Sequence, residues 1–198
     1  RLDGTPVFTS YIASTSSQSD GLRPLTMPVV DGGDILVSTS IGAVACVDIA
    51  SGRIKWLQRM ATPVSSTLAT SRVRPYQLHR PLVFEDQVIS LTPDYRGLVR
   101  LDRESGRILE RMSLEDQSGR SRPAYLLTDK KRVYVIGSSI VAFDPRDLSR
   151  VLWTKWPRPG ARSTPLSGRV HVAGNQLLVP TGEQLQILDG PTGRLLDS

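Results

Sequence analysis

The feature that most constrains the fold of this chain is a short phrase that recurs along it. An apolar run ends in Asp, three residues follow, and then Gly and Arg precede another apolar run. Clear copies begin at Asp48, Asp102 and Asp189, and a degraded copy begins at Asp144, so that successive copies are 54, 42 and 45 residues apart. A repeat of this length predicts a stack or ring of similar structural units.

Each repeat contains four short apolar runs separated by turn residues, which favours strands, and no segment shows sustained helical periodicity. Four antiparallel strands every 40 to 50 residues or so are typical of β-propeller blades. A solenoid is the alternative, but its repeats are usually shorter and its strands parallel, whereas these turns are of hairpin size. The expected strands are 26–30, 35–39, 43–48 and 53–57; 81–84, 88–91, 98–102 and 107–112; 125–127, 132–136, 140–144 and 150–154; and 170–173, 176–179, 184–189 and 194 onward.

The residues of the repeated phrase are those expected to form a hydrogen-bonded turn. An Asp side chain can accept hydrogen bonds from backbone amides one to three residues further on and so close a turn. The glycine then supplies a positive φ, which is the expectation for Gly52, Gly106 and Gly193. In the copy at Asp144, Leu148 replaces the glycine and Pro145 enters the turn, so that turn must differ. These aspartates are predicted to be structural rather than catalytic.

The net charge is +6 and the cationic excess is almost entirely arginine. Basic residues gather in expected loops, which suits an anionic partner such as nucleic acid, phospholipid or an acidic protein face. A solvated surface rich in arginine explains the same pattern, and the clusters lack the interleaved aromatic residues of single-strand binders. The residues of the candidate anion-contact loops are Arg72, Arg74, Arg120, Arg122, Arg158 and Arg162.

The sequence contains no catalytic constellation and no predicted cofactor or metal site. Cys46 is the single cysteine, which excludes an internal disulfide and argues against a zinc cluster. His79 and His171 are 92 residues apart, and each lacks a nearby carboxylate or cysteine. The pairs Glu85–Asp86 and Glu115–Asp116 are isolated, and neither has the spacing of a calcium loop.

No apolar stretch approaches the roughly 18 residues that a membrane-spanning helix needs. The chain opens Arg-Leu-Asp, without Met and without the basic and apolar regions of a signal peptide. It is therefore expected to be a part of a longer protein.

The run Ile35–Asp48, followed by Gly52–Trp56, resembles the repeat of pyrroloquinoline-quinone-like (PQQ-like) β-propellers. That repeat consists of a strand, a Gly turn, a strand ending Ala-Leu-Asp, then Thr-Gly-Lys and a strand ending in Trp. The resemblance extends over most of the chain in four copies. It implies an all-β fold of four-stranded antiparallel blades, about four of them, within a larger ring, because members of this family usually close with seven or eight blades.

In the family, the repeated Trp docks one blade on the next. Trp56 and Trp153 take that position here, whereas Glu110 and Asp197 take it in the second and fourth repeats, whose contacts should be weaker or of another kind. The opening Leu2–Thr9 resembles the segment that begins at Leu188 and is expected to be the end of a preceding blade. The expected organisation is one domain with a trailing strand at 1–12 and blades at 13–60, 61–114, 115–157 and 158–198.

The resemblance implies a non-catalytic scaffold that binds proteins, similar to the propeller lipoproteins that assist bacterial outer-membrane protein assembly. Such proteins hold their partners through loops and exposed strand edges. A periplasmic or extracellular location follows from the same resemblance. Open blade edges would pair with other chains unless they are covered. The cover would be the rest of the propeller, a second copy, or closure into a four-bladed ring. The alternative function is a part of a quinone- and calcium-dependent dehydrogenase whose site lies in other blades. An anion-binding surface built from the arginine-rich loops is a third option.

Overall fold

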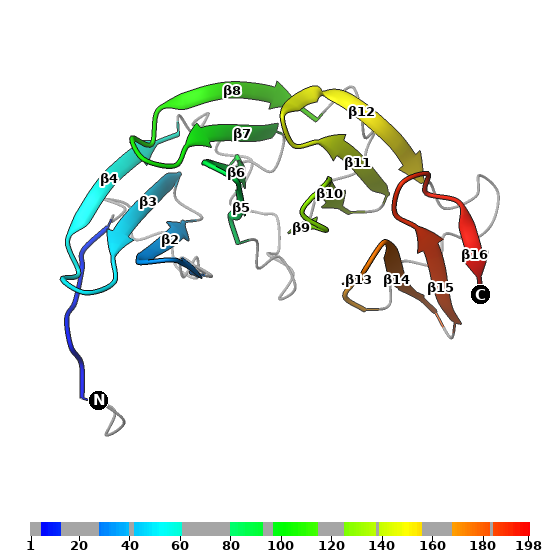
Figure 1. Ribbon diagram of the computed structural model, residues 1–198, viewed down its shortest axis with the longest axis horizontal. Coiled ribbons are helices and arrows are strands. Elements are labelled where there is room, and N and C mark those ends of the chain that lie inside the picture. Colours follow the sequence, from blue (N-terminus) through cyan, green and yellow to red (C-terminus); the bar gives the residue numbers. More distant parts are fainter. Residues whose placement is uncertain are drawn as a thin grey trace, which may run out of the picture. The chain divides into compact units, whose positions relative to one another are not determined.

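The computed structural model describes residues 5–12, 28–39, 42–60, 80–92, 97–114, 125–137, 139–155, 168–182 and 184–198. Within these ranges every regular element is a strand, and the strands form four antiparallel sheets of four (Figure 1). This confirms the all-β prediction. The expected blade boundaries lie at or beyond the edges of the described ranges and stay predictions.

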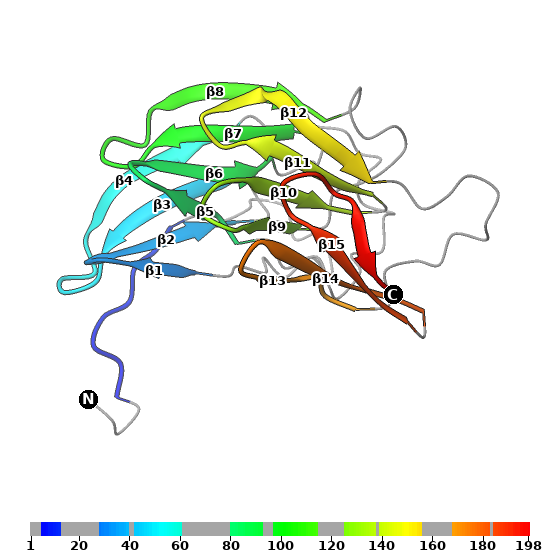
Figure 2. The same cartoon turned by 45° about the vertical axis from the view of Figure 1, so that its right-hand side comes forward.

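In each sheet the four strands follow one another in chain order, as Figure 2 shows for β1 to β4. The first sheet contains β1 (Val29–Asp31), β2 (Asp34–Ser38), β3 (Ala43–Asp48) and β4 (Ile54–Arg59); the second contains β5 (Leu82–Phe84), β6 (Gln87–Leu91), β7 (Gly97–Asp102) and β8 (Ile108–Ser113). The third contains β9 (Tyr125–Thr128), β10 (Val133–Ile136), β11 (Ile140–Asp144) and β12 (Asp147–Lys155); the fourth contains β13 (His171–Ala173), β14 (Gln176–Thr181), β15 (Gln184–Asp189) and β16 (Leu195–Asp197).

The chain divides into two compact units. The first unit comprises Arg1–Asp94 with Val99–Leu109, and the second comprises Tyr95–Leu98 with Glu110–Ser198. Sheet β1–β4 and most of sheet β5–β8 lie in the first unit, and the two remaining sheets lie in the second.

In the first unit, residues from two sheets share one core. Leu36, Cys46 and Trp56 of sheet β1–β4 pack with Val88 and Leu101 of sheet β5–β8. Strand β3 is buried along almost its whole length, which explains why its sequence is a continuous apolar run without alternation. The outer strand β4 alternates more, because one of its faces meets solvent.

The core of the second unit is built in the same way. Tyr134 and Ala142 of sheet β9–β12 pack with Leu177, Val179 and Leu188 of sheet β13–β16. All five side chains are at most 3% exposed. Each core therefore lies between two sheets, as in folds in which successive sheets stack face to face.

The expected strand 150–154 is too short. Strand β12 begins at Asp147, because Asp144 and Asp147 pair directly across a two-residue turn and the outer strand starts immediately after it. For the strand expected at 26–30, residues 26 and 27 lie outside the described ranges, and β1 extends to Asp31.

Candidate functional site

The carboxylate of Asp48 closes the turn between β3 and β4. Its Oδ1 accepts hydrogen bonds from the Ser51 N–H at 2.8 Å and from the Ser51 hydroxyl at 2.6 Å. The Gly52 N–H donates to the Asp48 carbonyl at 2.9 Å, and the φ of Gly52 is +69°. These hydrogen bonds favour the ionised carboxylate and lower the pKa of Asp48. The Ser51 hydroxyl makes the largest contribution, and the Ser51 N–H makes the next largest.

Two further turns repeat this geometry. The Asp102 carboxylate accepts from the Ser105 N–H at 2.7 Å, and the Asp189 carboxylate accepts from the Thr192 N–H at 3.2 Å and the Thr192 hydroxyl at 2.5 Å. Each clear copy of the phrase thus holds a hydroxyl residue three positions after its Asp. The sequence analysis missed this position, although the signal was present in all three copies.

The turn that follows Asp144 is of another kind. The Arg146 N–H donates to Asp144 Oδ1 at 2.9 Å across a two-residue turn. Leu148, which stands in the place of the glycine, is fully buried and belongs to β12. The side chain that replaces glycine therefore packs inside the protein.

The glycines of these turns lie against aromatic side chains from the preceding sheet. A Cβ at residue 106 would lie 2.5 Å from Cε3 of Trp56, and a Cβ at residue 193 would lie 2.6 Å from Cε3 of Trp153. The indole N–H of Trp56 donates to the Arg103 carbonyl, and that of Trp153 donates to the Gly190 carbonyl, both at 2.8 Å. The two acceptors are the residues that directly follow Asp102 and Asp189.

The N-terminal segment makes a similar contact with the first turn. A Cβ at residue 52 would lie 2.5 Å from ring atoms of Phe8, and the Ser10 hydroxyl donates to the Gly52 carbonyl at 2.5 Å. Phe8 thus contacts Gly52 as Trp56 contacts Gly106.

The acidic residue Glu110 replaces Trp at the docking position of β8. Its carboxylate accepts a hydrogen bond from the Leu148 N–H at 3.4 Å, and both residues belong to the second unit. At this position an acidic side chain therefore accepts a hydrogen bond from a backbone N–H of the following sheet, whereas a Trp packs on a glycine of that sheet.

Arg103 connects its turn to the hairpin between β1 and β2. Its guanidinium lies 2.6 Å from the Asp31 carboxylate, 3.9 Å from the Asp34 carboxylate, and donates to the Asp31 carbonyl at 3.1 Å. Lys55 pairs with Asp34 at 2.5 Å. This pairing raises the pKa of Lys55.

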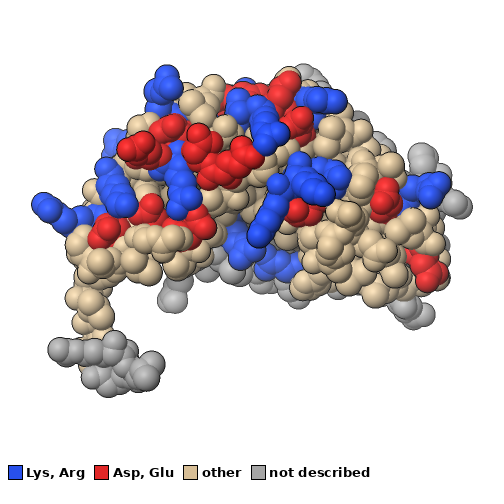
Figure 3. Space-filling view, viewed as in Figure 1, with Lys and Arg blue, Asp and Glu red and all other residues tan. Residues whose placement is uncertain are grey.

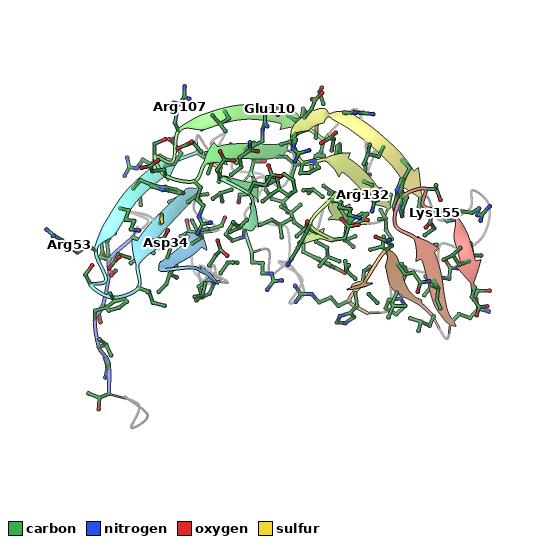
Figure 4. The ribbon with its side chains drawn as sticks, viewed as in Figure 1. Asp34, Arg53, Arg107, Glu110, Arg132 and Lys155 are labelled. Atoms are coloured by element: carbon green, nitrogen blue, oxygen red, sulfur yellow. The ribbon has the colours of Figure 1, made fainter. Side chains whose placement is uncertain are left out.

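These groups border a hollow of about 460 Å³ in the first unit, which is lined by Asp34, Lys55, Glu85, Asp86, Asp102, Arg103 and Glu104. Figure 4 labels Asp34, and Figure 3 shows acidic and basic side chains interspersed on the face in view. Both cations of the hollow are held by carboxylates. The ion pairs that line the hollow therefore connect the β1–β2 hairpin to the β7–β8 turn.

A different polar group joins the two sheets of the second unit. The Tyr134 hydroxyl donates to the Asp129 carboxylate at 2.8 Å, and Arg132, labelled in Figure 4, forms an ion pair with the same carboxylate. A Cβ at residue 190 would lie 2.7 Å from the Asn175 carbonyl oxygen and 2.9 Å from the Tyr134 hydroxyl oxygen, so both groups require glycine there. Burial raises the pKa of Tyr134 to about 12.

Most of the other residues that the sequence singled out are not among those that the structure describes. All six arginines of the candidate anion-contact loops lie outside the described residues, as do His79, Glu115 and Asp116. Cys46 is buried in the core, and its pKa is raised chiefly by desolvation. His171 is exposed on β13. In the described ranges, no group of three or more His, Cys, Asp or Glu side chains is placed to bind a metal ion.

No helix in the described part of the chain has the length and apolar character needed to cross a membrane.

The family can now be assigned from sequence. The model of the family described as outer membrane protein assembly factor BamB matches residues 3–197. The chain belongs to this family. Among curated proteins, no sequence matches the chain.

Solved structures agree with the family in fold. BamB from Moraxella catarrhalis is 23% identical, with a TM-score of 0.59 over 84% of this chain and 46% of that chain. Quinohemoprotein alcohol dehydrogenase ADHIIG from Pseudomonas putida HK5 is 17% identical, with a TM-score of 0.61 over 86% of this chain and 33% of that one. The corresponding dehydrogenase from Comamonas testosteroni is 18% identical, with a TM-score of 0.60 over 85% and 33%.

These likenesses show the fold, which is a β-propeller with four-stranded antiparallel blades. The family match, in agreement with them, confirms the PQQ-like repeat. BamB and the dehydrogenases share this fold, so the fold alone does not separate a scaffold from an enzyme. The chain spans less than half the length of each of these structures.

Proposed function

We propose that this chain is part of a non-catalytic propeller that binds proteins and assists the assembly of outer-membrane proteins in the bacterial periplasm. The observation that carries the proposal is the family match, which extends over residues 3–197. The partner is a protein held through loops or strand edges, in line with the way that sheets accept extended segments.

The contacts of the repeated residues support this proposal. Carboxylates at the repeated positions bind the amides of their own turns, and the indoles bind the next turn. These side chains serve the blades themselves. Recognition on propellers of this kind falls to the segments between blades, because loops tolerate variation that the packed sheets do not.

The second candidate is a part of a quinone- and calcium-dependent dehydrogenase. The observation that favours it is the structural likeness to the two quinohemoprotein alcohol dehydrogenases. In that case, the quinone and the metal would be bound by residues outside those that the structure describes.

The test uses the full-length protein and a strain of the source bacterium that lacks its gene. We expect the folded fraction of outer-membrane barrels, measured by heat-modifiable electrophoretic mobility, to fall in the deletion strain and to recover with the wild-type gene. The purified protein, supplied with pyrroloquinoline quinone and Ca²⁺, should not reduce an acceptor dye with alcohols. Normal barrel assembly in the deletion strain would overturn the proposal, and quinone-dependent dye reduction would favour the dehydrogenase.

A further inference from the structure

We draw no further inference here: the strongest candidate, the hollow between the β1–β2 hairpin and the β5–β6 and β7–β8 turns of the first unit, is a cluster of carboxylates that already pair with its two cations, Lys55 and Arg103, and nothing in the described part of the chain indicates a ligand for it.

Discussion

Trp56 occupies the space that a side chain at Gly106 would need, with its Cε3 atom 2.5 Å from the position of a Cβ there. The same indole donates its N–H to the carbonyl of Arg103. One aromatic side chain thus contacts two positions of the following turn. It requires glycine at position 106, whereas at position 103 it requires only a backbone carbonyl that can accept its N–H.

Trp56→Ala should destabilise the protein strongly, since the ring is 8% exposed and belongs to the shared core. Loss of a buried aromatic ring costs about 3–5 kcal/mol. Its neighbour Leu57 is 41% exposed, and Leu57→Ala should cost less than about 1 kcal/mol. Urea denaturation of the full-length protein measures both, and similar values for the two variants would contradict the docking role of Trp56.

Gly106→Ala and Gly174→Ala separate backbone strain from packing. Both glycines have positive φ, at +70° and +59°, so both variants carry the conformational penalty of about 1–2 kcal/mol. A Cβ at residue 174 meets no atom within 4 Å, whereas a Cβ at residue 106 meets Trp56. Gly106→Ala should therefore cost about 2 kcal/mol more than Gly174→Ala. Equal melting temperatures for the two variants would show that the indole moves aside freely.

The turn carboxylates make stability depend on acid pH. The pKa of Asp102 is lowered in the folded protein by hydrogen bonds from the Ser105 hydroxyl and N–H. The ionised turn therefore stabilises the protein above the pKa of the unfolded chain, about 3.9, and this contribution is lost as pH falls through the folded pKa. Asp102→Asn should lower the melting temperature at neutral pH and approach the wild-type value in strong acid. A constant difference at all pH values would contradict this account.

Tyr134 should make the stability of the folded protein depend on alkaline pH, in the opposite direction to the turn carboxylates. Its pKa is raised to about 12, whereas an unfolded tyrosine ionises near 10, so its contribution is present below pH 10 or so and is lost as pH rises toward 12. Tyr134→Phe removes one donor to Asp129 and should cost about 1 kcal/mol at neutral pH. It should also weaken the alkaline loss of stability. Thermal unfolding between neutral and alkaline pH measures both effects, and an unchanged alkaline limb would contradict the assignment.

The spacing of the repeat predicted the strands well because each sheet is built from chain-adjacent hairpins. Strands β3, β11 and β15 have the expected bounds, since a Gly or Asp turn marks both ends of each apolar run. The start of β12 was predicted wrongly, because Pro145 and Arg146 form a shorter turn that leaves Leu148 free to enter the strand and the core.

Contacts between sheets were less predictable. The ion pairs of Arg103 with Asp31 and Asp34 join residues about 70 positions apart, and nothing in the local sequence indicates them. A Cβ at residue 193 would meet the ring of Trp153, which comes from another sheet. Side chains distant in sequence decide these features, so a pattern read along one strand does not reveal them.

The sequence by itself determined the repeat, the all-β class, and the turn carboxylates, because hairpins and turns depend on residues close together in the chain. The tertiary structure alone decided which groups the joining side chains meet: aromatic rings on Gly106 and Gly193, an acidic side chain on the Leu148 N–H, and ion pairs at Arg103. The physical reason is that packing and ion pairing depend on distance in space. Two sheets that obey the same local rule can therefore be held together by different chemistry.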